Sequence, residues 1–408
     1  MSTPEFINNN DFNEQFIRTL TAAVKGCADL GEAFAVAARI VPGDFDSWAT
    51  EWIRKGDEVL AGADHSLSID DPISARRAYL RASEYYRQAF FYARVSLDDP
   101  ILHLAYTAHV NAFRAAVPLL PYATTVVDIE RDGVVAQGYL FRPDDSGIPR
   151  PTVIAPAGYD STAECGYILA AAAALDRGMN CLVFEGPGQG GVLYERRLPL
   201  RPDFESVLTP VVDWLLTQPG VDPAALVLFG RSFGGYLAPR GAAGEHRLAA
   251  LVCDPAQYDF GAAIRKRLGE DAWAQLQAGD PRVEDLLVTA MLTDPGAVNG
   301  FGWRMTAHGV DTLSAYLLEL SRFSLIGLAE QISCPTLALA GEGDFAGHGQ
   351  LPSFAAALTA PVTTHEFTIA EGAGGHCEGV GQDRLEQYVY GWLTDVLAHS
   401  NEPVHAQA

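Results

Sequence analysis

The feature that most constrains this chain is a Gly-x-Ser-x-Gly motif between an apolar run and a helix-like segment. The apolar run covers 226–229, the motif covers 230–234, and the helix-like segment covers 236–243. A sharp strand-to-helix turn exposes a serine hydroxyl, and small residues at both ends of the motif let the backbone crowd around it. This context predicts that Ser232 is a nucleophile. The alternative interpretation is a glycine-rich turn with a surface serine.

Around this motif, short apolar runs alternate with helical stretches. The predicted strands cover 153–155, 181–184, 226–229, 250–253 and 336–340, and the predicted helices between them cover 163–176, 204–217 and 236–243. A hairpin signal at 131–133 precedes them, and a last strand at 364–369 precedes a C-terminal helix at 383–398. Short buried strands separated by helices are typical of a mostly parallel sheet covered on both faces. The predicted fold class is therefore α/β.

The N-terminal part of the chain has a different character. From 11 to 118, apolar residues recur at helical spacing, and no strand-like alternation appears. We predict a helical domain at 1–120 and a catalytic domain at 121–399. A helical insertion at 259–332 interrupts the strand–helix rhythm of the second domain, and 400–408 is predicted to be a disordered tail.

Charge and cysteine usage restrict the partners and the compartment. The formal net charge of −23 makes nucleic acid or an anionic membrane surface an unfavourable partner, because both would be repelled. The six cysteines are scattered without Cys-x-x-Cys pairs, which favours free thiols in a reducing compartment. The N-terminus lacks a signal-peptide pattern, and the most apolar helical stretch, 167–175, is too short to span a bilayer. We therefore expect a cytoplasmic protein with no membrane partner, no metal and no organic cofactor.

A nucleophilic serine needs a histidine as base and a carboxylate to orient that histidine. For a nucleophile on such a turn, the order along the chain is Ser, then Asp or Glu, then His. Asp344 follows a buried strand, and His376 lies in a glycine-rich loop after the last strand, so both are predicted to complete a triad with Ser232. Asp254, which follows the strand after the nucleophile, is an alternative acid. The histidines that could replace His376 are His308, His348 and His365.

Attack on a carbonyl also needs N–H donors for the oxyanion. One donor is expected to be the N–H of Phe233, directly after the nucleophile, and the other to come from the loop at 156–160. In that loop the donor is Tyr159 or Gly158. Asp160, in the same loop, is predicted to bind substrate or assist proton transfer, or simply to cap the following helix.

A second glycine-rich stretch, 186–191, follows the strand at 181–184. It lacks the Gly-Lys-Ser/Thr of a phosphate loop and the spacing of a dinucleotide fingerprint. We interpret it as a structural turn near the active site.

Four stretches in this order carry a family resemblance. They are Pro-Ala-Gly-Tyr-Asp-Ser-Thr at 156–162, Leu-Asp-Arg-Gly-Met at 175–179, Phe-Glu-Gly-Pro-Gly-Gln-Gly at 184–190 and Gly-Arg-Ser-Phe-Gly-Gly at 230–235. With the helical N-terminal domain, they resemble the family of 2,6-dihydroxypseudooxynicotine hydrolase, the fungal polyketide-shortening hydrolases and the wider FrsA-like α/β-hydrolases. The resemblance implies an α/β-hydrolase fold, a helical domain that acts as a lid, and a homodimer. It places the triad on Ser232, Asp344 and His376.

The lid implied by this resemblance would bring part of the segment 83–92 over the site. Tyr86, Arg87 and Phe90 are predicted to contact an aromatic ligand. The alternative is that these side chains belong to the core, because aromatic residues at helical spacing usually do.

The triad and the resemblance together predict a serine hydrolase that works through an acyl-enzyme. The predicted reaction is cleavage of a C–C bond next to a ketone in a β-diketone-like or polyketide-derived substrate of secondary metabolism. The expected partner is a small aromatic or polyketide-like molecule. An ester, lactone or thioester hydrolase, or an acyl-transferring cyclase, would use the same triad and is the alternative. A third hypothesis is a non-catalytic ligand-binding protein on the same fold.

Overall fold

The computed structural model describes residues 5–131, 133–347 and 349–400. Apart from residue 400, the tail predicted at 400–408 lies outside the described residues, as does His348, one of the rival histidines. The described chain divides into two compact units. The helical unit comprises the described residues of Met1–Thr124, Gly191–Leu200 and Leu268–Leu320, and the sheet unit comprises those of Thr125–Gly190, Arg201–Arg267 and Ser321–Ala408.

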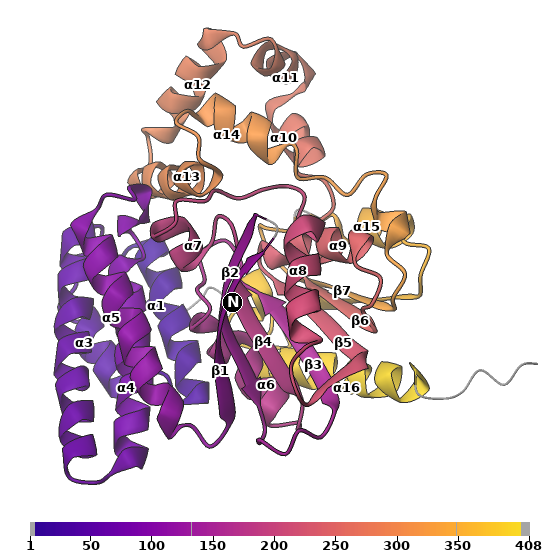
Figure 1. Cartoon of the computed structure of the whole chain (residues 1–408). Helices are drawn as coiled ribbons and strands as arrows, with labels where there is room; N and C mark the ends of the chain where they lie inside the picture. The colour runs from indigo at the N-terminus through magenta and orange to yellow at the C-terminus, as the bar shows by residue number, and fades with distance from the viewer. Residues whose placement is uncertain (1–4, 132, 348, 401–408) are drawn as a thin grey trace, which may run out of the picture. The chain divides into compact units, whose positions relative to one another are not determined.

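The N-terminal helices form the larger part of the helical unit. They are α1 (Asn10–Ala22), α2 (Leu30–Ala37), α3 (Phe45–Ser68), α4 (Pro72–Phe90) and α5 (Pro100–Ala116). Asp44 and Asp71 cap the first turns of α3 and α4 by accepting hydrogen bonds from backbone N–H groups. Helix α4 packs along both α3 and α5 (Figure 1). Trp48, Trp52 and Tyr85 are buried in the interior of this bundle and supply much of its apolar area.

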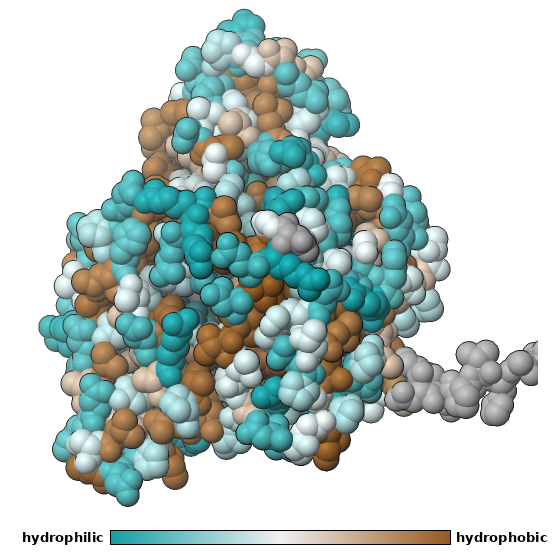
Figure 2. Space-filling view, viewed as in Figure 1, coloured by the Kyte–Doolittle hydropathy of each residue, from teal (hydrophilic) through white to brown (hydrophobic). Residues whose placement is uncertain are grey.

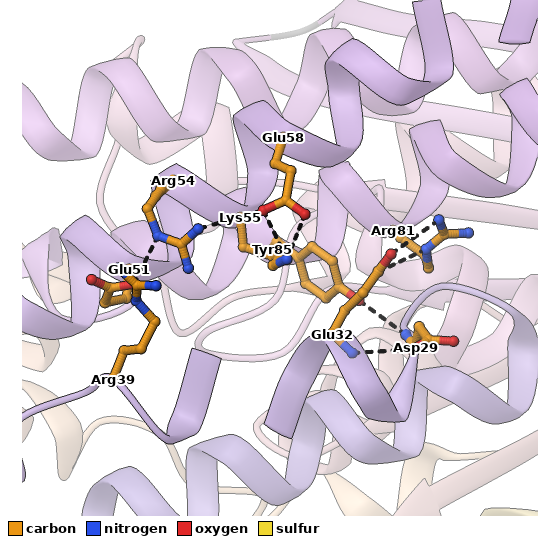
Figure 3. Close-up of polar contacts among 9 residues, drawn as sticks. All are labelled: Asp29, Glu32, Arg39, Glu51, Arg54, Lys55, Glu58, Arg81 and Tyr85. Carbon is orange, nitrogen blue, oxygen red and sulfur yellow. Dashed lines mark hydrogen bonds and ion pairs between the residues drawn. The ribbon is translucent and has the colours of Figure 1, made fainter. Parts of the chain in front are cut away.

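Polar contacts join α2 to α4 (Figure 3). The Tyr85 hydroxyl donates to Glu32 at 2.6 Å and accepts from the N–H of Asp29 at 3.0 Å. Arg81, one turn before Tyr85, contacts the same Glu32 carboxylate with an Nε–Oε2 distance of 2.9 Å. Burial and Glu32 raise the pKa of the Tyr85 phenol, so Tyr85 stays a neutral donor. The buried hydroxyl is therefore satisfied on both sides.

Four α-helices of the helical unit lie in the segment 268–320: α11 (Glu270–Gln277), α12 (Pro281–Met291), α13 (Pro295–His308) and α14 (Leu313–Leu320). They come from the segment interpreted as an insertion at 259–332, which is divided between the two units. Asn299 on α13 donates to the carbonyl oxygen of Tyr92 at 2.9 Å, and Thr306 donates to that of Val95 at 2.6 Å. Because these partners lie far apart in the chain, no local sequence pattern signals the contact.

The sheet unit is built on strands β1 (Ala123–Arg131), β2 (Val134–Arg142), β3 (Arg150–Pro156), β4 (Asn180–Glu185), β5 (Val221–Arg231), β6 (Ala250–Asp254), β7 (Thr336–Gly341) and β8 (Val362–Phe367). Their order in the sheet is β1-β2-β4-β3-β5-β6-β7-β8. Strand β2 pairs antiparallel with β4, whereas the pairings from β4 through β8 are parallel. The predicted α/β class with a mostly parallel sheet is confirmed.

Helices cover both faces of this sheet. Helices α8 (Glu205–Leu215) and α9 (Gly234–Gly244) pack together on one face, and α6 (Ala172–Leu175) and α16 (Gln382–Ser400) lie on the other (Figure 1). Short helices α7 (Gly190–Tyr194), α10 (Phe260–Leu268) and α15 (Leu351–Ala357) follow β4, β6 and β7. Because the strands from β3 onward run in one direction, their following loops gather at one edge of the sheet, where such folds place their sites.

The face drawn in Figure 2 carries polar and apolar residues interspersed. Three exposed apolar side chains of the helical unit, Leu67, Ile69 and Ile73, lie around the turn between α3 and α4. Isolated exposed apolar residues are common on folded proteins. In the described part of the chain, no helix is both long enough and apolar enough to cross a bilayer.

Replacing Gly138 with alanine is expected to destabilise the sheet unit. An added Cβ would lie 2.1 Å from the carbonyl oxygen of Val183 and 2.8 Å from Cα of Phe184, both on the neighbouring strand β4. The backbone of β4 cannot move away without losing its pairing with β2, so the cost should be about 1–3 kcal/mol or more. The measurement is the thermal midpoint of Gly138→Ala by circular dichroism.

The matched control is Gly391→Ala in α16, where an added Cβ meets no atom within 4 Å. Alanine is favoured over glycine inside a helix by about 1 kcal/mol, so this variant should melt at or above the native temperature. Equal midpoints for the two variants would contradict the expected clash.

Candidate active site

The Gly-x-Ser-x-Gly motif forms the predicted sharp turn between β5 and α9. Ser232 has a φ of +57°, a left-handed conformation that is uncommon for a residue with a side chain. A Cβ on Gly230 would lie 2.0 Å from the carbonyl oxygen of Gly234, and one on Gly235 would lie 2.0 Å from that of Pro255. At Gly234 the nearest atom is 3.8 Å away. The motif had suggested Gly230 and Gly234 as the positions where the backbone is crowded. The structure confirms Gly230, but the second crowded position is Gly235 and not Gly234.

The structure brings Ser232, His376 and Asp344 together. Ser232 Oγ lies 2.8 Å from His376 Nε2, and His376 Nδ1 lies 3.0 and 3.1 Å from the two carboxylate oxygens of Asp344. The Asp344 side chain is only 2% exposed, and the His376 side chain is 17% exposed. Asp344 also accepts from the N–H of Ala346 at 2.7 Å, which fixes its orientation. A buried carboxylate on Nδ1 leaves Nε2 as the acceptor for a serine proton.

The loops that carry Asp344 and His376 are joined directly. The carbonyl oxygen of Glu342 accepts from the N–H of Gly375 at 2.9 Å, and the Glu342 carboxylate accepts from the N–H of Ile369 at 2.8 Å. A Cβ on Gly341 would lie 2.4 Å from the carbonyl oxygen of Gly375, so glycine at 341 allows the two loops to touch. Glu342 thus links the loops in addition to lying in a turn.

The rival residues have other partners. Asp254 contacts Arg231, with Nε 3.2 Å from Oδ2. His365 lies on β8 and stacks on Tyr388, with ring centroids 4.0 Å apart. His308 belongs to the helical unit, where burial lowers its pKa to about 3 and keeps the ring neutral. The geometry therefore favours Asp344 over Asp254 as the partner of the histidine.

The predicted oxyanion loop lies beside the nucleophile. A Cβ on Gly158 would be 3.3 Å from Cβ of Ser232, which shows how close the two backbones come. The N–H of Gly158 donates to Ser161 Oγ at 2.7 Å, so this donor is already engaged. The ring of Tyr159 packs on the ring of Phe233, with centroids 4.3 Å apart. Of the two loop donors considered, Tyr159 therefore stays the one we expect to serve an oxyanion.

Gln189 is a buried residue that the sequence analysis did not single out. It lies in the glycine-rich stretch after β4, where its side-chain oxygen accepts from the N–H of Gly186 at 2.8 Å. Its side-chain nitrogen donates to the carbonyl oxygen of Ala157 and, at 3.3 Å, to that of Gly158. The stretch is therefore a turn that holds the predicted oxyanion loop through one amide. An uncharged amide flanked by glycines was the only sequence signal for this role.

Aromatic side chains of the sheet unit surround the residue after the nucleophile. The ring of Phe233 lies within 6.0 Å, centroid to centroid, of the rings of Tyr159, Tyr236, Phe260 and Phe323. Gln257 donates from its side chain to the carbonyl oxygen of Ser232 at 2.8 Å. Phe233, Tyr236 and Phe323 are buried, whereas Tyr159 and Phe260 are partly exposed, so an aromatic cluster packs directly beside Ser232.

The residues predicted as lid contacts lie inside the helical unit. The Tyr86 hydroxyl donates to Asp57 at 2.6 Å, which places Tyr86 in the packing between α3 and α4. Arg87 has a 9% exposed side chain with a guanidinium nitrogen 3.6 Å from the carboxylate of Glu84. Phe90 is buried, and its ring packs against three others, those of Tyr106, His109 and Tyr194. Within the described residues, no cluster of three or more His, Cys, Asp or Glu side chains is arranged to hold a metal ion.

Comparisons with known proteins identify the family. No protein-family model matches the chain. The hydrolyase poxO of Penicillium oxalicum is 32% identical over 350 residues, which cover 81% of this chain and 83% of that protein. The 20-hydroxy-prefusarin hydrolase FUS2 of Gibberella moniliformis is 32% identical over 340 residues, covering 80% of each. The chain belongs to the family of these fungal hydrolases.

Solved structures agree with this assignment at the level of the fold. The structure of 2,6-dihydroxy-pseudo-oxynicotine hydrolase has a TM-score of 0.73 at 24% identity, covering 94% of this chain and 97% of that one. AbyA5 has a TM-score of 0.61 at 18% identity, covering 91% and 94%. The α/β-hydrolase fold and the family predicted from the motifs are confirmed, and the chain is a hydrolase.

Replacing Gln189 with alanine is expected to slow catalysis by about 100-fold, because a displacement of about 1 Å at a catalytic group has an effect of this size. The variant loses the amide that holds the carbonyl groups of Ala157 and Gly158, so the oxyanion loop is free to shift. The measurement is kcat for a short-chain p-nitrophenyl ester. Gln218→Ala is the matched control. The Gln218 amide also donates to a backbone carbonyl, that of Trp214 at 3.3 Å, but this carbonyl belongs to α8 and not to the loop. Equal rates in the two variants would contradict the role of Gln189.

Proposed function

We propose that this hydrolase uses Ser232, His376 and Asp344 as a catalytic triad and forms an acyl-enzyme on Ser232. The observation that carries the proposal is the unbroken line of contacts from the Asp344 carboxylate through both ring nitrogens of His376 to Ser232 Oγ. The left-handed turn at Ser232 supports it, because such a turn presents the hydroxyl at the edge of the sheet.

The reaction begins when Ser232 Oγ attacks the carbonyl carbon and His376 Nε2 takes the hydroxyl proton. The N–H groups of Phe233 and Tyr159 stabilise the oxyanion. When the intermediate collapses, the bond from the carbonyl carbon to the leaving group breaks. The leaving group departs with the electron pair and takes up the proton held on His376, with Asp160 assisting where the leaving group is an enolate. Water then gives one proton to the neutral His376 and attacks the acyl carbon. The second intermediate expels Ser232 Oγ, which takes that proton back from His376, and the carboxylic acid is released.

The bond we propose to be broken is a C–C bond next to a ketone in a β-diketone-like or polyketide-derived substrate. In such a substrate the leaving carbon delocalises its electron pair into the second carbonyl group as an enolate. Two observations support this choice: the motif resemblance, and the partly exposed aromatic rings of Tyr159 and Phe260, which pack on Phe233 next to Ser232. The relative FUS2 is named for the hydrolysis of 20-hydroxy-prefusarin.

Asp160 is proposed to bind the substrate or to assist proton transfer to the enolate. It directly follows Tyr159 in the loop beside Ser232, and it is only partly exposed. An enolate has to be protonated on carbon after the bond breaks, whereas the leaving oxygen of an ester takes the proton of His376 directly. C–C cleavage should therefore depend on Asp160, whereas ester cleavage should not.

Hydrolysis of an ester, lactone or thioester, or acyl transfer in a cyclase, is the second candidate function. The same triad geometry supports it, because all of these reactions share the steps up to the acyl-enzyme.

We further propose, from the family resemblance, a lid role for the helical domain, substrate contact by Arg87, and a homodimer. The scattered cysteines support the proposal of a cytoplasmic location. Tyr86 and Phe90 are not included, because the Tyr86 hydroxyl is bonded to Asp57 and the buried Phe90 ring packs inside the bundle.

Replacing Ser232 with alanine is expected to lower kcat by at least about 10⁴-fold, because removal of a triad nucleophile abolishes the covalent route. The two substrates are a short-chain p-nitrophenyl ester and an aryl β-diketone, and both should be affected. A fluorophosphonate should label the native chain and leave Ser232→Ala unlabelled. Unchanged labelling of the variant would place the nucleophile elsewhere.

Replacing Asp160 with asparagine separates the two candidate functions. If Asp160 assists protonation of an enolate, diketone cleavage should fall by about 10²–10⁴-fold, while ester hydrolysis should change little. Asp176→Asn, an exposed aspartate in the same unit, is the matched control. Ester turnover alone in the native chain would favour the second candidate function.

A further inference from the structure

Three charged side chains are buried beside the triad: Arg231, Asp254 and Glu378. Arg231 directly precedes Ser232 at the end of β5, Asp254 ends the neighbouring strand β6, and Glu378 lies two residues after His376. The relative exposure of Asp254 and Glu378 is 0%, and the Arg231 side chain is 10% exposed. Charged groups are rarely buried so completely unless they are paired. The partners of each group therefore have to be accounted for.

Arg231 joins the nucleophile strand to the turn that carries His376. Its Nε donates to Asp254 Oδ2 at 3.2 Å, and one terminal nitrogen donates to the carbonyl oxygen of Cys377 at 3.0 Å. The other terminal nitrogen donates to the carbonyl oxygen of Leu169 at 3.3 Å. Because Cys377 follows His376 directly, this hydrogen bond from the guanidinium helps to hold the backbone that carries His376.

The cluster holds two carboxyl groups but one cation. Oδ1 of Asp254 and both carboxyl oxygens of Glu378 have no hydrogen-bond donor among the described groups. Burial and the neighbouring Asp254 raise the pKa of Glu378 to about 10, and burial raises the pKa of Asp254 while Arg231 opposes that rise. A proton kept on Glu378 supplies the missing donor and makes the cluster neutral overall.

The turn after His376 needs such an anchor. Cys377 and Glu378 have φ values of +48° and +59°, two consecutive left-handed residues with side chains. Each such residue costs of order 1–3 kcal/mol and persists only when its surroundings hold it. Two hydrogen bonds hold the backbone of this turn. The Gln382 side chain donates to the carbonyl oxygen of Cys377 at 2.9 Å, and the N–H of Gly381 donates to the carbonyl oxygen of Glu378 at 2.7 Å. The Cys377 thiol also donates to the carbonyl oxygen of Asp254 at 3.6 Å, and the buried Glu378 side chain is a further point of attachment.

We propose that Glu378 is a positioning residue for His376 and that it works as a neutral carboxylic acid donating a hydrogen bond to Asp254. Asp254 in turn neutralises Arg231, which holds the carbonyl of Cys377. The three side chains thus link the turn that carries Ser232 to the turn that carries His376. The catalytic part of this inference rests on the proposed function, but the protonation state of Glu378 does not.

A pH dependence follows from this arrangement. The charged and titratable groups around the pair are Arg231 on β5, Asp254 on β6, Asp344 after β7 and, in the same turn, His376 and Cys377. Loss of the proton would leave two carboxylates opposing one cation and would push Glu378 away from Asp254. Activity should therefore fall as the pH rises toward about 10, where Glu378 ionises.

The first test compares Glu378→Gln with Glu378→Ala, using hydrolysis of p-nitrophenyl butyrate by the full chain. Glutamine keeps a neutral donor, so Glu378→Gln should retain the native rate within about threefold and lose the alkaline decrease, whereas Glu378→Ala should lose about 10-fold or more in kcat with KM little changed. Glu371→Gln, on an exposed glutamate before the same turn, is the control. Equal losses of kcat in Glu378→Gln and Glu378→Ala would overturn the proposal. So would a decrease in activity at alkaline pH that is the same in Glu378→Gln as in the native chain.

The second test asks whether Arg231 needs at least one of the two carboxyl groups. Asp254→Asn leaves Glu378 free to ionise and pair with Arg231, so each single amide variant should stay folded and active. The double variant Asp254→Asn/Glu378→Gln leaves the Arg231 cation without a carboxylate, so its loss in activity and melting temperature should exceed the sum of the single effects. Additive effects would overturn the shared-proton arrangement.

The third test does not depend on activity. An infrared difference spectrum between the native chain and Glu378→Gln at about pH 8, well above the usual glutamate range, should contain the carbonyl band of one protonated carboxylic acid. The presence of this band would support the proposal even if neither substrate were turned over, and its absence would overturn it. Failure of the proposed function is read separately, from the fluorophosphonate labelling of Ser232.

Discussion

The structure of the site depends on the pairing of β5 with β6. Arg231 lies opposite Asp254 in this register, and the N–H of Ser232 donates to the carbonyl oxygen of Asp254 at 2.7 Å. The left-handed Ser232 is thereby held against the neighbouring strand, and glycine at 235 lets α9 start close to Pro255. A slip of one residue would turn the side chains at the strand end to opposite faces.

Much of this site could be predicted from sequence because its signals are local. A buried run followed by Asp344, and a glycine-rich loop before His376, each mark the end of a strand. In a parallel sheet these ends share one edge, so chain order was enough to bring Ser232, Asp344 and His376 together. The same reasoning predicted the sheet, whose strands are short buried runs separated by helices.

The remaining features depend on partners far apart in the chain. Gln189 holds a loop 32 residues before it, and Arg231 donates to the carbonyl of Cys377, 146 residues after it. Residues 268–320 belong to the same compact unit as the N-terminal helices through contacts such as Asn299 with Tyr92. Propensity and periodicity describe a residue and its neighbours, so they carry no information on which distant backbone group a buried side chain meets.

The neutrality of the buried cluster also bears on the chemistry of the base. In the proposed mechanism His376 accepts a proton from Ser232 and later releases it, so the charge around its ring should favour neither form strongly. With Arg231 balanced by Asp254 and a proton on Glu378, Asp344 contributes the net negative charge beside the ring. A second uncompensated carboxylate would stabilise the imidazolium and so hinder the step in which His376 gives its proton to the leaving group. A buried cation next to the nucleophile is thus compatible with base catalysis when the same cluster contains its counter-charge and a retained proton.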